Sequence, residues 1–468
     1  MQKKPNILIL MTDQQRADCY GAAGNTKIRT PNMDWLANEG LRFKQATTVC
    51  PLCMPARASF INGLYPHNHG MWDNEGKMPA DDETFFRHIQ ADGYFTAHIG
   101  KSHYYIHESN LHMRDREDYM HARGLEYVHE TTGPLATQHT ESYMTDDWKE
   151  KGLLDIFKED YKERIYQHKG WYARQSPLPV DDFMDSYVGK KAVEFIESYD
   201  DPRQMCLFVG FPGPHHPWDA PGEYASMYDP IEMPEAIGIP PQNSNLPDFV
   251  GKKSDLKYSP DMTAQDIQKM RANYYGKISL IDYWFGRILD AYDIRGLLDD
   301  LFIIFISDHG EMLGDHGRIS KCIFKESSVR IPLVIRWPGR IPAGSASDAL
   351  VENIDVFPTI LEAVGIKQSA RCLGKSLWPA INKPDGDFRE SQLSEIFYED
   401  SRNVMLRTSK YKYVVDDQGY GFMFYDLAND PEEQNNLIGQ ECAAAEEHEI
   451  RDELFKRILA AQYVMESK

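Results

Sequence analysis

Four short apolar runs that stop abruptly at polar residues constrain most strongly how this chain can fold. None of these runs contains Asp, Glu, Lys or Arg, and they cover residues 6–11, 94–99, 205–211 and 301–307. Runs of this length are typical of strands that are buried on both faces of a sheet. Helical patterns lie between them, at residues 34–39, 185–199 and 272–292. The alternation predicts an α/β fold with a large, doubly wound, mostly parallel sheet flanked by helices.

The polar residues that follow the four runs are expected to meet at one edge of this sheet. In chain order they are Asp13-Gln14, Lys101 with His103, His215-His216, and Asp308-His309. In doubly wound sheets, ligands bind at the carboxyl ends of the strands. The sequence therefore predicts one site to which all four strands contribute.

The pattern changes after about residue 370. We expect a catalytic α/β domain at 1–370 and a smaller C-terminal α+β subdomain at 371–468. The subdomain is predicted to hold antiparallel strands and a closing helix, at residues 403–407, 411–415, 421–427 and 443–465. In the first domain, residues 104–175 are expected to form an insertion near the site. Residues 212–262, rich in Pro and Gly, are expected to form a long ordered loop.

The formal net charge of −21 argues against a nucleic-acid partner, because such binding draws on dense positive charge. An anionic substrate would then need a local cluster of cations or a metal ion. No apolar stretch approaches the roughly 20 residues of a membrane span, so no membrane partner is expected. The apolar run at 7–11 is shorter than the core of a secretory signal. We expect a cytoplasmic protein, or a periplasmic one if a leader has been removed.

Two of the seven cysteines, Cys50 and Cys53, form a C-x-x-C pair that allows several interpretations. A redox or zinc pair is one of them, but a zinc site needs four ligands and no second such pair is present. Two buried cysteines acting as small hydrophobic side chains are another. A third pattern starts at Cys53 alone, because Pro55 and Arg57 follow it two and four positions later. Cys50 does not fit that pattern and is expected to be a packing residue.

The third pattern makes physical sense as the start of a helix. Pro55 suits the first helical turn, so Cys53 is expected at the helix N-terminus. Backbone N–H groups and the helix dipole favour an anion there. Arg57 lies one turn further along the same face and is expected to hydrogen-bond back to residue 53.

The segment from Cys53 to Gly63 resembles the signature C-x-P-[SA]-R-x-x-x-x-[TN]-G of the type I, formylglycine-dependent sulfatases in the alkaline phosphatase-like superfamily. Other segments resemble this family's elements, in the same order along nearly the whole chain: Asp13-Gln14, Gly100-Lys101-Ser102-His103, Pro214-His215-His216-Pro217, residues 307–317, Lys321, and residues 425–437. The resemblance implies an alkaline phosphatase/sulfatase-like fold and a sulfuric ester hydrolase. It also implies that a formylglycine-generating maturation enzyme oxidises Cys53, whose hydrated aldehyde is the nucleophile.

The resemblance further implies one divalent cation, held by Asp13, Gln14, Asp308, His309 and the residue derived from Cys53. Carboxylate and amide oxygens suit Ca²⁺, which is the ion expected here, or Mg²⁺. The imidazole of His309 leaves Mn²⁺ or Zn²⁺ as alternatives.

The catalytic roles that the family implies fall on Cys53, Arg57, Lys101, His103, His215 and Lys321. The cationic members, with the metal, would form a positive pocket inside an acidic protein. His215, together with Lys321, is expected to protonate the departing alcohol oxygen. His103 is expected to remove the second hydroxyl proton and so release sulfate. His216 is the weaker candidate of the two adjacent histidines.

The other histidines are expected to have minor roles. We expect His67, His69 and Trp72 to line the substrate entrance, and His316 to be structural. Surface positions, some within reach of substrate, are expected for the histidines at 107, 112, 121, 129 and 139.

The sequence departs from the family at two metal positions. Many sulfatases have a second aspartate where this chain has Gln14, and many have asparagine where it has His309. Phosphonate monoester hydrolases and related phosphodiesterases of the superfamily also use Asp-Gln and Asp-His, so they are the alternative function. Lys101 and His103 favour a sulfatase over this alternative, because those relatives tend to carry neutral polar groups at the two positions. A non-catalytic metal or redox protein with an unmodified Cys53 is a third hypothesis.

The substrate is expected to be the sulfate ester of a sugar or of another small organic alcohol. The aromatic and histidine content of residues 104–175 and the long loop at 212–262 suit a sugar, while choline sulfate and aryl sulfates remain alternatives. The C-terminal helix could pack against a second copy, so a homo-oligomer is an alternative to a monomer.

Overall fold

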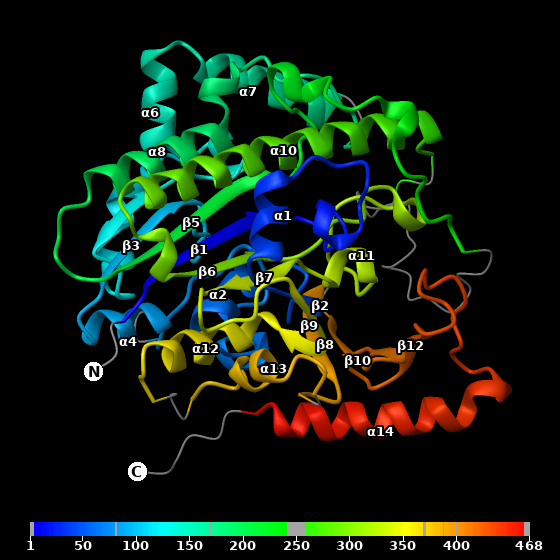
Figure 1. Cartoon of the computed structure of the whole chain (residues 1–468). Coiled ribbons are helices and arrows are strands. Elements are labelled where there is room, and N and C mark those ends of the chain that lie inside the picture. Colours follow the sequence, from blue (N-terminus) through cyan, green and yellow to red (C-terminus); the bar gives the residue numbers. More distant parts are fainter. Residues whose placement is uncertain are drawn as a thin grey trace.

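The computed structural model describes residues 4–79, 82–167, 170–240, 259, 261–367, 371–386, 388–398 and 401–462. Within them, eight strands form a central sheet in the order β4-β3-β5-β1-β6-β7-β2-β8 (Figure 1). The strands are β1 (Asn6–Asp13), β2 (Leu41–Thr47), β3 (Phe95–Gly100), β4 (Tyr127–Glu130), β5 (Met205–Pro214), β6 (Leu301–Ser307), β7 (Leu333–Arg336) and β8 (Ser345–Glu352).

The four predicted strands are confirmed as β1, β3, β5 and β6, which are neighbours in this sheet. Their pairings β3–β5, β5–β1 and β1–β6 are all parallel, so their carboxyl ends meet at one edge. β7 is the exception and runs antiparallel to both β6 and β2. The mostly parallel sheet expected from the sequence is therefore present.

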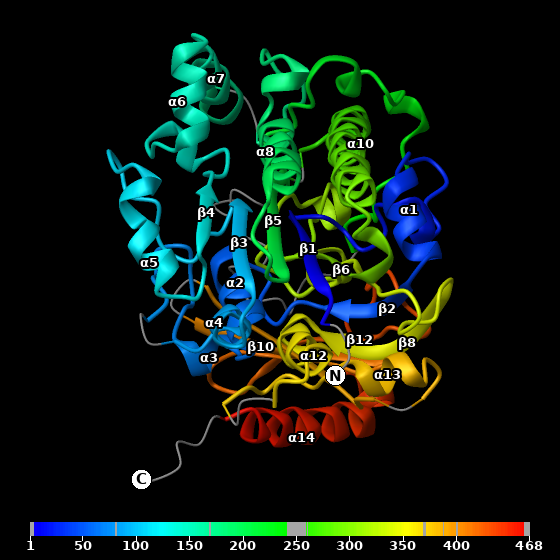
Figure 2. The ribbon, with the colours of Figure 1, turned by 60° about the vertical axis from the view of Figure 1, so that its left-hand side comes forward.

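Different helices cover the two faces of the sheet (Figure 2). One face is covered by α1 (Pro31–Asn38), α8 (Met184–Ser198) and α10 (Ala264–Ile294), and the other by α2 (Cys53–Asn62), α4 (Phe85–Ala91) and α12 (Val356–Ala363). Leu8 and Leu10 of β1 pack into the first core, whereas Ile7 and Ile9 pack into the second. Because both faces are covered, both sets of alternating residues must be apolar.

The predicted helices at 34–39, 185–199 and 272–292 are confirmed as α1, α8 and α10. α10 begins earlier than expected, at Ala264, because the Thr263 side chain accepts from the backbone N–H of Asp266 in a capping box. The other α-helices among the described residues are α3 (Pro66–His69), α5 (Glu117–His121), α6 (Tyr143–Glu150), α7 (Leu154–Lys162), α11 (Glu326–Val329), α13 (Trp378–Asn382) and α14 (Ala444–Ala460). The expected insertion at 104–175 contains α5 to α7 and also β4, which joins the main sheet beside β3.

A second sheet follows in the C-terminal part, with the antiparallel order β12-β11-β10-β9. Its strands are β9 (Gln392–Tyr398), β10 (Ser401–Arg407), β11 (Tyr411–Val415) and β12 (Gly421–Asp426), and α14 packs on it. The three predicted strands and the closing helix are confirmed, while the helix end expected at residue 465 and the loop positions 241–258 and 260 lie outside the described residues. The domain boundary at 370 stays a prediction. None of the helices that the structure describes is both long enough and apolar enough to cross a membrane.

Candidate active site

The adjacent ends of β1 and β6 bring Asp13 and Asp308 together, and Cys53 opens α2 beside them. The ligand atoms of Asp13, Cys53, Asp308 and His309 all lie within 4.8 Å of one another, and all four residues are buried. Two carboxylates, a thiol and an imidazole thus surround one point. This donor set fits a divalent cation, because the carboxylates suit hard ions and the imidazole extends the range to Mn²⁺ or Zn²⁺.

Gln14, the fifth predicted metal ligand, lies next to these four residues. Its backbone N–H donates to Asp308 Oδ1 at 2.9 Å, and its side-chain Oε1 accepts from Lys321 Nζ. Gln14 has a φ of 71°, in the left-handed region that non-glycine residues seldom adopt. Such backbone strain is common at functional sites.

Arg57 and Lys101 neutralise the two carboxylates. Arg57 Nε donates to Asp308 Oδ2 at 2.8 Å and Nη2 to Asp13 Oδ2 at 3.3 Å, while Nη1 donates to the Lys101 carbonyl oxygen at 2.8 Å. Lys101 Nζ also donates to Asp13. Burial alone would raise the pKa of Asp13, but Lys101 and Arg57 outweigh it and hold that pKa well below its ordinary value. The expected hydrogen bond from Arg57 back to residue 53 is replaced by these contacts, because the two carboxylates lie within its reach.

Position 53 is arranged to stabilise negative charge. Cys53 Sγ lies 3.1 Å from His309 Nε2, and His309 Nδ1 donates to the Gly310 carbonyl oxygen at 2.9 Å. Burial and Asp13 would raise the pKa of the Cys53 thiol, but Lys321 and His309 outweigh them and lower it. Burial would lower the pKa of His309, but Asp308 and Cys53 raise it above its usual value. An anionic group is therefore favoured at this position.

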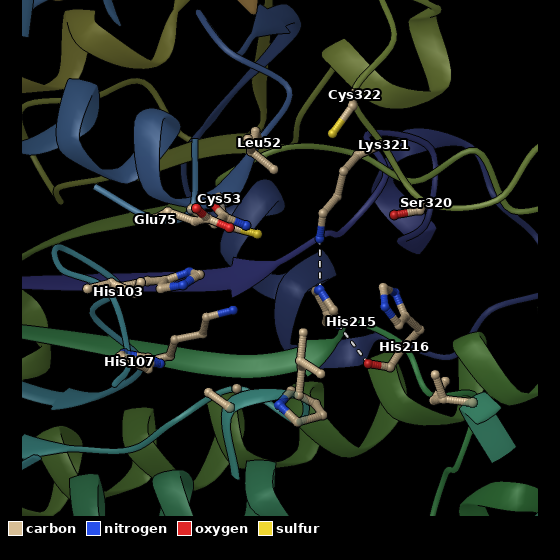
Figure 3. A pocket seen from close by; sticks show the side chains of 18 of the residues that line it. Leu52, Cys53, Glu75, His103, His107, His215, His216, Ser320, Lys321 and Cys322 are labelled. Atoms are coloured by element: carbon tan, nitrogen blue, oxygen red, sulfur yellow. Dashed lines mark hydrogen bonds between the residues drawn. The ribbon is translucent and has the colours of Figure 1, made fainter. Parts of the chain in front are cut away.

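Lys321 and His215 form a pair on the opposite side of the pocket (Figure 3). Lys321 Nζ donates to His215 Nε2 at 2.7 Å, and His215 Nδ1 donates to the His216 carbonyl oxygen at 2.7 Å. Burial, together with His216 and Lys321, holds the pKa of His215 well below its usual range. Burial acts in the same direction on Lys321, but Cys53 and Asp13 outweigh it and raise the pKa of Lys321. A charged lysine thus donates to a neutral imidazole.

A cavity of about 690 Å³ opens above position 53. Its described lining residues are Leu52, Cys53, Asn74, Glu75, Lys101, His103, Ile106, His107, Gly133, Pro134, Leu135, Ala136, His139, Ile165, Gly170, His215, His216, Ile319, Ser320, Lys321 and Cys322. Five of the six residues predicted to be catalytic are among them, whereas Arg57 lies beneath the cavity floor among the carboxylates. The described lining includes five histidines and no Trp, Tyr or Phe.

Some lining residues were not foreseen from the sequence. His107, expected at the surface, is only 7% exposed, and neither of its ring nitrogens has a hydrogen-bond partner among the described residues. Its ring lies 4.9 Å from that of His103, whose Nδ1 is likewise buried without a hydrogen-bond partner in the described part of the chain. Asn74 Oδ1 accepts from the Met54 backbone N–H at 3.0 Å and so caps the first turn of α2. A histidine or asparagine in a loop without a regular pattern gives no sequence signal for such a position.

The expectation that His67, His69 and Trp72 line the entrance is wrong. His67 Nδ1 contacts Glu395 Oε1 at 2.7 Å, and His69 Nε2 contacts Ser59 Oγ at 2.9 Å. The Trp72 ring packs against Phe397 instead. His67 and His69 lie on the short helix α3, and they contact the C-terminal sheet and α2 rather than the cavity. His216, the weaker candidate, does line the cavity beside His215.

The two cysteines of the C-x-x-C pair have different surroundings. Cys50 is 0% exposed and belongs to an apolar cluster with Met312 and Phe324, which confirms its packing role. Cys53 alone faces the carboxylates and His309. The structure therefore gives the two thiols no shared metal site within the part of the chain that it describes.

Comparison with known proteins places these features in context. The family model described as Sulfatase matches residues 5–366, and the one described as N-sulphoglucosamine sulphohydrolase, C-terminal, matches residues 314–462. An arylsulfatase from Clostridium perfringens (strain 13 / Type A) is 29% identical over 470 residues, which cover 97% of this chain and 94% of that protein.

Two solved structures share the fold over almost the whole chain. The phosphonate monoester hydrolase of Agrobacterium radiobacter aligns with a TM-score of 0.80 at 23% identity, covering 98% of this chain and 96% of that one. A protein solved in complex with its substrate D-glucosamine-2-N,6-O-disulfate aligns with a TM-score of 0.76 at 22% identity, covering 98% of both chains.

Proposed function

Because this chain belongs to the sulfatase family of the alkaline phosphatase-like superfamily and is a sulfuric ester hydrolase, we propose that it cleaves a sulfate monoester through a formylglycine derived from Cys53. The observation that carries the proposal is the place of Cys53. The cysteine of the C-x-P-x-R pattern opens α2, its ligand atom lies within 4.8 Å of those of two aspartates and a histidine, and it faces the cavity. A maturation enzyme would have to supply the oxidation.

Asp13, Asp308, His309 and Gln14 would hold one divalent cation against position 53. When bound, such an ion lowers the pKa of an adjacent hydroxyl and offsets negative charge. Ca²⁺ is the ion proposed here, because three of the four side chains offer oxygen ligands. The Asp13 carboxylate is already ionised at neutral pH, since Lys101 and Arg57 hold its pKa well below its ordinary value.

A formylglycine hydrate at position 53 supplies one hydroxyl for attack on sulfur and a second whose deprotonation expels sulfate. Side chains around position 53 bind the sulfuryl group and transfer the protons. Lys101 and Lys321 face the cavity from different sides, so both can hold the sulfuryl oxygens while charge moves on to the departing oxygen. The His215–Lys321 pair supplies the proton to that oxygen: the charged Lys321 ammonium gives it up, and the neutral His215 ring, which accepts from Lys321 Nζ at 2.7 Å, orients the ammonium. His103, uncharged because burial and Lys101 hold its pKa low, takes the proton of the second hydroxyl.

We propose a sulfated sugar as the substrate. The five lining histidines offer ring nitrogens that can donate to or accept from hydroxyl groups. The described lining has no aromatic plate of the kind that recognises a quaternary ammonium group, which weighs against choline sulfate. One structural neighbour, the protein solved with D-glucosamine-2-N,6-O-disulfate, also has a sulfated sugar as its substrate.

Parallel hydrolysis assays with one leaving group test the reaction type. The matured protein should release 4-nitrophenol from 4-nitrophenyl sulfate with a kcat/KM at least tenfold higher than from 4-nitrophenyl phenylphosphonate. Phosphonate monoester hydrolysis is the second candidate, because of the likeness to the Agrobacterium radiobacter enzyme. The reverse ratio would select that candidate.

Peptide mass spectrometry tests the nucleophile. Trypsin should release the peptide 45–57, and the aldehyde form should be present only after co-expression with a formylglycine-generating enzyme. Activity should rise in proportion to the aldehyde fraction, and the Cys53→Ser variant should stay inactive. Full activity in a protein whose residue 53 is entirely thiol would refute the proposal.

A further inference from the structure

The C-terminal motif at residues 425–437 has no part in the chemistry above. None of its residues lines the cavity. Yet Glu433 of this motif hydrogen-bonds to Lys325 and Glu326, which follow Lys321 closely in the chain. A motif that touches the support of a catalytic side chain is a candidate for positioning it.

Glu433 is the centre of these contacts. It is 2% exposed, and its Oε1 accepts from Lys412 Nζ at 2.8 Å. Its Oε2 accepts from the backbone N–H of Glu326 at 2.8 Å, and its backbone carbonyl oxygen accepts from Lys325 Nζ at 2.9 Å. Glu433 has a φ of 56°, a left-handed conformation that aims both its side chain and its carbonyl at this segment.

Two neighbours of Glu433 on the C-terminal sheet, Lys412 and Tyr425, also hydrogen-bond to the segment 324–326. Lys412, 0% exposed, donates to the Phe324 carbonyl oxygen at 2.8 Å as well as to Glu433. The Tyr425 hydroxyl accepts from Lys325 Nζ at 2.9 Å. Three consecutive residues are therefore held from one side by buried, charge-assisted hydrogen bonds, which are the strong kind.

Lys321 is connected to the segment 324–326 by only two intervening residues. Its Nζ must remain within hydrogen-bond distance of both Gln14 Oε1 and His215 Nε2. Among the described residues, one backbone–backbone hydrogen bond holds the stretch from Lys321 to Phe324, from the Cys322 N–H to the Pro51 carbonyl oxygen at 3.1 Å. A shift of residues 324–326 would therefore also displace the Lys321 ammonium group. Small displacements of catalytic groups lower the reaction rate.

We propose that Glu433 is a positioning residue for Lys321, so that the C-terminal sheet sets the placement of one active-site cation. The inference rests on the proposed function for the role of Lys321 in hydrolysis. It concerns the support of that lysine and adds no group to the chemistry.

A double-mutant cycle with 4-nitrophenyl sulfate tests the coupling. Glu433→Gln keeps the shape of the side chain and removes its charge. We expect it to lower kcat/KM about tenfold in the wild-type background and less than twofold in a Lys321→Met background. An equal loss in both backgrounds, or no loss in wild type, would overturn the proposal.

Glu395→Gln is the matched control. Glu395 is also 0% exposed, lies in the same sheet, and pairs with Arg402 at 2.7 Å and His67 at 2.7 Å. Glu395→Gln should lower the free energy of unfolding about as much as Glu433→Gln does. Its effect on kcat/KM should be the same fold-change with and without Lys321, because it does not touch the lysine's support.

Hydrogen exchange provides a readout that does not need activity. Amides in the peptide 318–326 should exchange at least fivefold faster in Glu433→Gln than in wild type, but not in Glu395→Gln. Unchanged exchange would overturn the inference even if the enzyme is a sulfatase. Faster exchange in a protein that hydrolyses no sulfate ester would support it while refuting the proposed function. If Glu433→Gln fails to fold, Tyr425→Phe, which removes one hydroxyl, should give the same pattern with smaller amplitude.

Discussion

Arg57 allows the electrostatic design of the site to be tested without any substrate. Its side chain is 1% exposed and donates three hydrogen bonds, two of them to the carboxylates of Asp13 and Asp308. Hydrogen bonds to charged groups contribute about 1.5–3 kcal/mol each. Removing one partner of a buried ion pair costs about 3–5 kcal/mol, because the other charge stays buried. We therefore expect Arg57→Met to lower the free energy of unfolding by about 4 kcal/mol in the presence of a chelator.

Divalent cations should reverse most of this loss, because an ion between the carboxylates replaces the missing positive charge. Urea unfolding with EDTA and with Ca²⁺ or Mn²⁺ measures the difference, since binding to the folded state alone adds stability. Arg203→Met is the control. Arg203 also pairs with two carboxylates, Glu126 at 3.0 Å and Asp201 at 2.8 Å, but its side chain is 37% exposed. Such surface pairs contribute about 0–1 kcal/mol. Equal losses for the two variants, or no effect of cations on Arg57→Met, would refute the reasoning.

Three further predictions concern other residues. Burial raises the pKa of Glu130 from 4.5 to about 7, so its carboxyl keeps a proton in the folded state that the unfolded chain loses. The contribution of this carboxyl group to the free energy of unfolding is therefore complete below pH 4.5 and is lost as the pH rises through 7. In urea unfolding, Glu130→Gln should be more stable than wild type by about 3 kcal/mol at pH 8 and equally stable near pH 4.5. His107→Phe keeps a ring but loses the unpaired nitrogens, so kcat/KM for a sugar sulfate should fall about tenfold relative to that for 4-nitrophenyl sulfate; parallel losses would contradict the assigned role. Gly100→Ala would place a Cβ 2.1 Å from the Gly210 carbonyl oxygen at a φ of 96°, whereas Gly93→Ala meets only the backbone strain of a φ of 92°. Thermal unfolding should show the former destabilised by about 2 kcal/mol more than the latter.

The parts of the fold that were predicted correctly are those where burial leaves no choice of residue. β1 and β6 are covered on both faces, so their residues must be apolar throughout, and their polar successors mark the site. β9 was missed because its buried residues include Glu395, whose carboxylate is held by His67 and Arg402 rather than by an apolar pattern. β2 was missed because its alternation of apolar and polar residues is interrupted where its register against β8 shifts, between Phe43 and Gln45.

The candidate site was foreseen where residues sit at strand ends or in the helix-start pattern. Asp13, Cys53 and Asp308 are gathered as expected. The side-chain partners were less predictable, because they depend on contacts between segments far apart in the chain. His107 lines the cavity with its carbonyl oxygen accepting from Nε2 of His139, another lining residue, at 3.1 Å. His67 leaves it for Glu395, a residue on another sheet. Neither contact has a local signature.

The parallel pairing of β1 with β6 also determines when the site can form during synthesis of the chain. Thr12 aligns with Ser307, so the two aspartates beside Cys53 cannot meet until residue 308 has left the ribosome. At a synthesis rate of roughly 5–20 residues per second, on the order of 10–50 seconds pass between the emergence of residue 53 and that moment. During this interval the thiol lies on an unfinished polypeptide, whereas in the completed fold it is 1% exposed. A modifying enzyme therefore has a limited period in which to reach it.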